Sequence, residues 1–281
     1  MKYLLPALFI LLSGIFAGCN NVEQSATQTT IPGSGTIPPP PPFPINVLNV
    51  YPHDTTSYTQ GLIIYNGQMY ESTGGQAEAN SWKSWVGKTE LKTGKQLSKT
   101  MLDKAYFGEG ITILNGKLYQ LTWTSRIGLI YDPATLRKTA EFSLKTDGWG
   151  ITNDSTNLII SDGTSNLYYL NPADFSTLKV VGVTDNNGPV NNLNELEFIN
   201  GYIYANRWQT NYILKIDPSN GQVVGRADLG SLLKQYSRAG FNESTYNNGD
   251  AVLNGIAYDP VSKKVYLTGK LWPIMLETSF E

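Results

Sequence analysis

The chain has 281 residues, of which 16% are charged, and its net charge is -2 at pH 7. This length allows one large domain or two ordinary ones. The nearly balanced charge provides no basic field that would attract a polyanion, which argues against nucleic acid as a partner.

The N-terminus has the features of an export signal. A positively charged start is followed by an apolar run from Leu4 to Phe16, which is too short to span a bilayer and has the size of a signal-peptide core. The only cysteine, Cys19, follows small residues at the position of cleavage, a pattern that resembles a bacterial lipoprotein site. We therefore expect residues 1–18 to be a signal peptide and Cys19 to carry a lipid. The alternative is ordinary secretion with an unpaired thiol.

Residues 19–44 are predicted to be a tether. They are rich in Ser, Thr and Gln and then contain five consecutive prolines, residues 38–42. Such a composition cannot bury a core and favours a stiff, extended spacer. The spacer would hold the folded domain, residues 45–281, away from a membrane of the bacterial cell envelope, at its periplasmic or outer-membrane face.

The folded domain is predicted to be all-β, because short strands alternate with turns and no helical periodicity is sustained. One strand-turn-strand unit recurs five times, with copies of roughly 40 to 60 residues, the length of a propeller blade. The fifth copy is cut short, and the segment from Ile45 to Val50 would supply its missing strand. The sequence therefore predicts a five-bladed β-propeller closed by an N-terminal strand. A β-sandwich is the alternative, but it gives no reason for one hairpin to recur.

Asn-Gly turns fix the expected pairing within the inner hairpins, because a two-residue turn sets the register on both sides. Counting outward from each turn predicts that polar side chains of different blades reach the same end of the domain. The predicted pairs are Gly108 with Trp123, Glu109 with Thr122, Asn194 with Arg207, and Gln60 with Thr73.

The first strand of each propeller blade lines the axis, so seven residues from the five units should converge at one mouth of the channel. These residues are Gln60, Glu109, Trp149, Asn194, Glu195, Asn254 and Lys270. Alternation along a strand would, however, turn Glu195 away from its neighbour Asn194. Carboxylates, amides, an ammonium group and tryptophan faces together are typical of a small-ligand site.

The same residues carry a resemblance to a known family, the glutamine cyclotransferases of the plant and bacterial type. The matching motifs are Thr59-Gln60-Gly61-Leu62, Phe107-Gly108-Glu109-Gly110, Leu121-Thr122-Trp123, Gly148-Trp149-Gly150, Leu193-Asn194-Glu195-Leu196-Glu197, Leu253-Asn254-Gly255-Ile256-Ala257-Tyr258 and Thr268-Gly269-Lys270-Leu271-Trp272-Pro273. The resemblance implies a five-bladed propeller, unrelated in fold to the zinc-dependent animal enzymes. The chain departs from the family pattern between Gly75 and Trp85, which is longer here, and at Arg207, where an apolar residue is usual.

The resemblance implies conversion of the N-terminal glutamine of a peptide or protein to pyroglutamate, with release of ammonia. Glu109 is the candidate proton shuttle: aromatic surroundings would raise its pKa, whereas Lys270 would lower it. The candidate catalytic residues are Glu109, Asn194 and Lys270, and the candidate substrate-binding residues are Gln60, Trp123, Trp149, Trp208 and Asn254. Each of these roles has a structural alternative. Glu109 would then be a solvated turn residue, the tryptophans would only pack the blades, and the amides of Gln60 and Asn194 would only cap strand ends.

The only histidine, His53, is expected to make a structural hydrogen bond rather than to act as a base. A zinc site of the usual ligands cannot be assembled, and we expect no required cofactor, although a channel cation held by carbonyls would leave no trace in the sequence. The expected form is a monomer. The alternative functions are a non-catalytic surface propeller that binds peptides or proteins, and a propeller lyase or sugar-acting enzyme, whose motifs this chain does not resemble.

Overall fold

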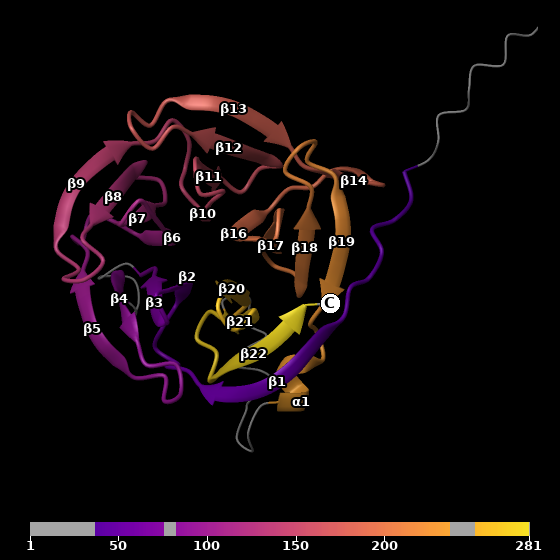
Figure 1. Ribbon diagram of the computed structural model, residues 1–281, viewed down its shortest axis with the longest axis horizontal. Helices are drawn as coiled ribbons and strands as arrows, with labels where there is room; N and C mark the ends of the chain where they lie inside the picture. Colours follow the sequence, from indigo (N-terminus) through magenta and orange to yellow (C-terminus); the bar gives the residue numbers. More distant parts are fainter. Residues whose placement is uncertain (1–36, 76–82, 237–250, 281) are drawn as a thin grey trace, which may run out of the picture. The chain divides into compact units, whose positions relative to one another are not determined.

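The structure, a computed structural model, describes residues 37–75, 83–236 and 251–280. Five four-stranded antiparallel sheets are arranged as blades around a common axis (Figure 1). In each of the first four blades the strands follow the chain from the axis outward. The described part of the chain is therefore a five-bladed β-propeller, as the repeats predict.

The first four blades are formed by consecutive strands. Blade 1 consists of β2 (Thr59–Tyr65), β3 (Gln68–Thr73), β4 (Trp85–Thr89) and β5 (Gln96–Met101). Blade 2 consists of β6 (Gly108–Leu114), β7 (Lys117–Thr122), β8 (Ile127–Tyr131) and β9 (Lys138–Ser143). Blade 3 consists of β10 (Ile151–Asn153), β11 (Leu158–Ser161), β12 (Asn166–Leu170) and β13 (Thr177–Gly182). Blade 4 consists of β16 (Leu193–Ile199), β17 (Tyr202–Arg207), β18 (Tyr212–Ile216) and β19 (Val223–Asp228).

Blade 5 joins the two ends of the propeller. Its inner strands are β20 (Leu253–Asp259), β21 (Lys264–Gly269) and β22 (Ile274–Phe280), and its outer strand is β1 (Ile45–Pro52). β1 pairs antiparallel with β22, from Ile45 opposite Phe280 to Pro52 opposite Ile274. The predicted closure by the N-terminal strand is confirmed, because the first and last strands of the described chain pair within one blade.

Short elements occupy the connections between blades. A two-stranded sheet, β14 (Thr184–Asp185) with β15 (Gly188–Pro189), precedes blade 4, and the helix α1 (Leu232–Tyr236) follows it. No helix within the described ranges has the length and apolar character needed to cross a bilayer.

Hydrophobic clusters fill the spaces between neighbouring blades. One cluster, for example, combines Tyr70 and Val86 of blade 1 with Ile113 and Leu118 of blade 2, all of them buried. Every residue of the inner strand β6 is buried, whereas most residues of the outer strand β5 are exposed. The inner strands are buried on both faces. Their sequences are therefore nearly continuous runs of apolar and small residues, without the alternation of apolar and polar residues that a strand with one solvent-exposed face shows.

The Asn-Gly turns form as predicted, but the register beyond them differs from the prediction. Both residues of the Asn115-Gly116 turn have positive φ, as a tight hairpin requires, and Leu114 pairs with Lys117. Further out, Gly108 pairs with Thr122 instead of Trp123. The reason is a β-bulge, which places one extra residue on the inner strand.

The same bulge recurs in three other blades. It lies between Thr59 and Gly61, between Leu193 and Leu196, and between Leu253 and Ile256. As a result Thr59, not Gln60, is opposite Thr73, and Leu193, not Asn194, is opposite Arg207.

The segment before β1 packs against blade 4. The Arg226 amide donates to Pro41 O at 3.0 Å, and the Phe43 amide donates to Arg226 O at 3.3 Å. The Phe43 ring lies 5.8 Å from the ring of Tyr204 and 5.6 Å from that of Phe280. Residues 40–43, here called the N-terminal strap, thus contact blades 4 and 5 within the stretch predicted to be a tether. Cys19 and residues 1–36 lie outside the described residues.

Candidate active site

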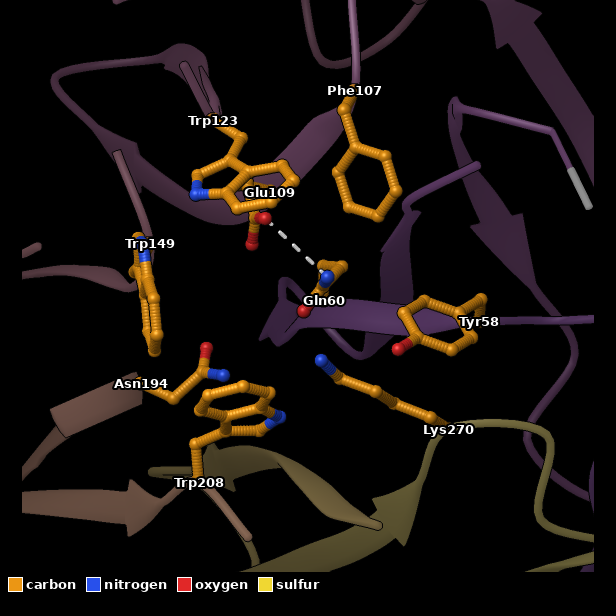
Figure 2. Close-up of a pocket in the computed structure, with 9 residues that line it drawn as sticks. All are labelled: Tyr58, Gln60, Phe107, Glu109, Trp123, Trp149, Asn194, Trp208 and Lys270. Atoms are coloured by element: carbon orange, nitrogen blue, oxygen red, sulfur yellow. Dashed lines mark hydrogen bonds between the residues drawn. The ribbon is translucent and has the colours of Figure 1, made fainter. Parts of the chain in front are cut away.

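A pocket of about 130 Å³ lies where the inner strands begin and the second strands end. Figure 2 shows side chains from all five blades pointing into it. They are Tyr58, Gln60, Phe107, Glu109, Trp123, Trp149, Asn194, Trp208 and Lys270. The volume is below the ~300–1,000 Å³ typical of pockets for drug-sized ligands. The pocket therefore suits a single amino-acid side chain better than a large cofactor.

The structure brings together most of the residues that the sequence predicted. Gln60, Glu109 and Asn194 reach the pocket because each belongs to the extra, bulged part of its inner strand. A bulge re-aims a side chain that a regular ladder would direct elsewhere. Lys270 enters from the turn that follows β21.

Two residues predicted to converge on the pocket do not line it. Asn254 lies behind Gln60, and its Nδ2 donates to Gln60 Oε1 at 3.1 Å and to Thr59 O at 3.0 Å. The expectation that Asn254 reaches the pocket mouth is therefore wrong; its bulge directs it toward blade 1 instead. Glu195 also turns away, in agreement with the alternation argument.

Glu109 is the acidic side chain of the pocket. It is 5% exposed, and its Oε1 accepts a hydrogen bond of 3.4 Å from Gln60 Nε2. Burial raises the pKa of Glu109 well above its ordinary value, and the nearby Lys270 ammonium opposes this shift without cancelling it. The effect of burial therefore exceeds that of the cation, a balance that the sequence could not decide.

The backbone around Glu109 is held on both sides. Ser72 Oγ donates to Glu109 O, and the Gly110 amide donates to Trp149 O at 2.8 Å. A Cβ on Gly110 would lie 2.8 Å from Ile151 N, so only glycine allows β6 to approach blade 3 this closely. Glycine after Glu109 is thus required by the packing of the inner strands, and Glu109 is not a solvated turn residue.

Aromatic rings form the walls of the pocket. Trp149 and Trp208 meet edge to face with ring centres 5.5 Å apart, and Phe107 contacts Trp123 in a similar way at 5.8 Å. Trp123 is 37% exposed and so forms part of the rim. Such walls exclude water from the polar groups between them, which strengthens every electrostatic interaction there.

Two of the wall residues, Tyr58 and Phe107, were not predicted. Lys270 Nζ lies 4.7 Å from the centre of the Tyr58 ring, a cation–π contact. A signal for both was present in the sequence, since each aromatic residue stands two positions before the polar residue of its blade, Gln60 or Glu109. Residues two apart on a strand face the same side.

Asn194 and Glu195 are neighbours on one bulge but have different surroundings. Asn194 is 3% exposed, and its Oδ1 accepts no hydrogen bond from the described residues. The two Glu195 oxygens accept from the amides of Ile256, at 2.9 Å, and Leu62, at 3.4 Å. Glu195 therefore ties blade 4 to blades 5 and 1, whereas Asn194 presents a free acceptor to the pocket.

His53 is buried outside the pocket and makes structural contacts. Its Nδ1 is 2.8 Å from Trp272 O, and its Nε2 is 3.0 Å from Glu71 Oε1. Burial lowers the pKa of His53, but the charge and hydrogen bond of Glu71 and the Trp272 carbonyl together raise it above its usual value. His53 thus fastens the turn that follows Lys270 to blade 1, consistent with the structural role expected from the sequence.

The remaining expectations concern groups at or beyond the edge of the pocket. Arg207 does not line the pocket, and its Nε donates to Asn191 O at 3.2 Å. Most of the longer segment after Gly75, residues 76–82, lies outside the described residues. In the parts of the chain that the structure describes, no three His, Cys, Asp or Glu side chains group as metal ligands.

Comparisons with known proteins show the family to which this chain belongs. The family model for glutamine cyclotransferases matches residues 16–280. A glutaminyl-peptide cyclotransferase of Arabidopsis thaliana is 39% identical over 234 residues, which are 82% of this chain and 69% of that protein. The crystal structure of Myxococcus xanthus glutaminyl cyclase aligns with a TM-score of 0.77 and 33% identity, and covers 86% of this chain and 98% of that one. The chain belongs to the glutamine cyclotransferase family and is an enzyme of the glutaminyl-peptide cyclotransferase class.

Proposed function

We propose that this enzyme cyclises the N-terminal glutamine of peptides or proteins, with Glu109 as the proton shuttle. The observation that carries the proposal is a single buried carboxyl group among aromatic walls, with a raised pKa and with amide and ammonium groups around it. The reaction needs no external nucleophile. It needs a folded-back substrate, a group that moves one proton, and donors for a developing oxyanion.

The proposed step balances without any other reactant. The neutral α-amine nitrogen attacks the side-chain carbonyl carbon, forming the new C–N bond and a tetrahedral intermediate. The bond to the amide nitrogen then breaks, and ammonia leaves. Glu109 begins as the neutral acid, which its raised pKa favours, and donates its proton to the departing nitrogen. It recovers a proton from the former α-amine nitrogen and returns to its starting state.

The other pocket groups have complementary roles in this proposal. Asn194 Oδ1, which accepts no hydrogen bond from the described residues, would accept one from the attacking amine and orient it. Lys270 would stabilise the oxyanion that forms on the side-chain carbonyl oxygen. Gln60 would contact the substrate amide, while Trp123, Trp149 and Trp208 would enclose the methylene groups of glutamine.

The test compares three proteins that begin at Asn20: the unsubstituted chain, Glu109→Gln, and Glu141→Gln as a control. Glu141 is an exposed glutamate that pairs with Lys138 on β9. With a Gln-initiated peptide, we expect ammonia release by the unsubstituted chain and by Glu141→Gln, and a loss of about 10²–10⁴-fold in kcat/KM for Glu109→Gln. Mass loss of one ammonia from the peptide confirms the product. Equal rates for all three would move the proton shuttle to another group.

We also propose that Cys19 carries the lipid that anchors the enzyme to the bacterial cell envelope. The support comes from the apolar run and the small residues that precede this cysteine. In a bacterium that processes lipoproteins, the full chain should partition with membranes and carry an acyl group in its mass spectrum. Cys19→Ala should lose both properties. A soluble full chain with an unmodified thiol would contradict the proposal.

A further inference from the structure

Three buried side chains, two of which line the pocket, form a directed line of hydrogen bonds that crosses three blades. Asn254 of blade 5 donates to Gln60 Oε1 of blade 1 at 3.1 Å. Gln60 Nε2 then donates to Glu109 Oε1 of blade 2 at 3.4 Å, and Figure 2 shows this second contact. The three side chains are 1%, 3% and 5% exposed, so water cannot readily replace one of them as a partner.

Asn254 fixes the direction of this line. A side-chain amide has a donor end and an acceptor end, and a free Gln60 could present either end to Glu109. Both Asn254 Nδ2 bonds go to acceptors, Thr59 O and Gln60 Oε1. Asn254 thereby holds the oxygen of Gln60 on its own side, and the nitrogen of Gln60 must face Glu109.

The position of Asn254 is itself set by the bulge of β20. The next residue, Gly255, has φ 115°, a conformation that favours glycine, and its amide donates to Asn206 Oδ1 of blade 4 at 2.8 Å. The backbone that carries Asn254 is therefore anchored to blade 4, while its side chain reaches blade 1. Such anchoring gives the amide one preferred orientation.

The direction of the line decides where the Glu109 proton sits. Because Oε1 accepts from Gln60 Nε2, the proton of the neutral acid belongs on Oε2, the oxygen that points into the pocket in Figure 2. A reversed Gln60 would instead accept that proton and hold it away from the reaction. A hydrogen bond donated to a carboxylate favours its ionised form, so a reversed Gln60, which donates none, would favour the neutral form of Glu109.

We propose that Asn254 is a positioning residue of the cyclotransferase reaction, which orients Gln60 so that the Glu109 proton faces the substrate. This proposal rests on the role of Glu109 proposed above. Asn254 would act through Gln60 rather than by touching the substrate. Its loss should therefore affect turnover more than substrate binding.

The experiment measures kcat, KM and the pH dependence of kcat/KM for Asn254→Ala, Gln60→Ala and the double variant. Asn153→Ala is the matched control, because Asn153 Nδ2 also bonds across blades, to Thr112 Oγ1 at 2.8 Å and Ile113 O at 3.1 Å, away from the pocket. We expect Asn254→Ala to lower kcat about 10-fold or more, with a smaller change in KM because Gln60 also contacts the substrate amide in the proposed function. The fall in kcat/KM at high pH, which reports ionisation of Glu109, should shift to higher pH. Asn153→Ala should lower only thermal stability.

The double variant separates positioning from general loss of structure. If Asn254 acts through Gln60, adding Asn254→Ala to Gln60→Ala should lower kcat little further. Fully additive losses, or an unchanged pH profile in Asn254→Ala, would overturn the proposal. Failure of the proposed function is distinguishable, because it would appear as an inactive unsubstituted chain or as an active Glu109→Gln variant.

Discussion

Three buried glutamates lie on two inner strands of this propeller. Glu109 belongs to β6, while Glu195 and Glu197 belong to β16, and all three are less than 10% exposed. Burial raises the pKa of each of them, and the neighbouring Glu197 raises that of Glu195 further. A raised carboxyl pKa means that the folded chain holds the proton more tightly than the unfolded chain does.

The first prediction concerns Glu197, whose pKa burial raises from 4.5 to about 8. Between these values the unfolded chain releases its proton while the folded chain keeps it, so the free energy of unfolding falls as pH rises through this window. Glu197→Gln should remove this loss, on the order of a few kcal/mol at pH 8, and should match the unsubstituted chain below pH 4.5. The glutamine oxygen can still accept from the Tyr258 amide.

The measurement is urea denaturation of both proteins across this pH range, with the exposed Glu141→Gln as control. Parallel stability curves for Glu197→Gln and the unsubstituted chain would show that Glu197 has the same pKa folded and unfolded. Glu109→Gln should behave like Glu197→Gln in stability while losing activity. The carboxyl group of Glu109, proposed as the proton shuttle, therefore costs the fold stability that a neutral side chain would restore.

At the scale of elements, glycines within or next to the inner strands set how closely the blades approach one another. A Cβ on Gly61 would lie 2.5 Å from Ile111 N, and one on Gly150 would lie 1.9 Å from Asn194 O. These contacts are with backbone atoms of the next blade, which cannot move like the end of a flexible side chain. The same glycines flank the residues that enter the pocket, so packing and function share one set of positions.

The second prediction is that Gly150→Ala disrupts both stability and activity. Its Cβ would push against the bulge that holds Asn194, and overpacking of this kind costs about 1–3 kcal/mol. Gly182→Ala, at the end of β13, is the control, because no atom lies within 4 Å of its added Cβ. Denaturation midpoints and kcat/KM for a Gln peptide should fall for Gly150→Ala alone. An unchanged midpoint and kcat/KM for Gly150→Ala would mean that the inner strands can move apart to accommodate the added Cβ without loss of stability or activity.

The sequence was sufficient to predict the blades but not the bulges within them. Asn-Gly turns, strand periodicity and the recurring unit predict the five sheets, and the unpaired segment after Pro44 predicts the closing strand. Counting from a turn assumes a regular ladder, however, and the extra residue at Gln60 or Glu109 breaks it. The bulge depends on contacts between blades, which no local pattern records. The prediction that Asn254 reaches the pocket failed for the same reason.

At the scale of the whole propeller, ring closure depends on both β1 and the segment before it. β1 completes blade 5, whereas the N-terminal strap, residues 40–43, crosses to β19 of blade 4 (Figure 1). The Phe43 ring packs against both Tyr204 of blade 4 and Phe280 of blade 5. The strap therefore links the blades on either side of the last junction in the ring.

The third prediction is that a chain beginning at Ile45 is less stable than one beginning at Ile37. Removing the strap deletes the bonds of Pro41 and Phe43 to Arg226 and exposes apolar surface between the blades, a loss of about 1–3 kcal/mol. Phe43→Ala in the longer chain should reproduce most of this loss, whereas Pro38→Ala, at an exposed position, should not. Chemical denaturation measures the difference. Equal midpoints for the two chains would show that β1 alone closes the ring, and the strap would then contribute nothing to it.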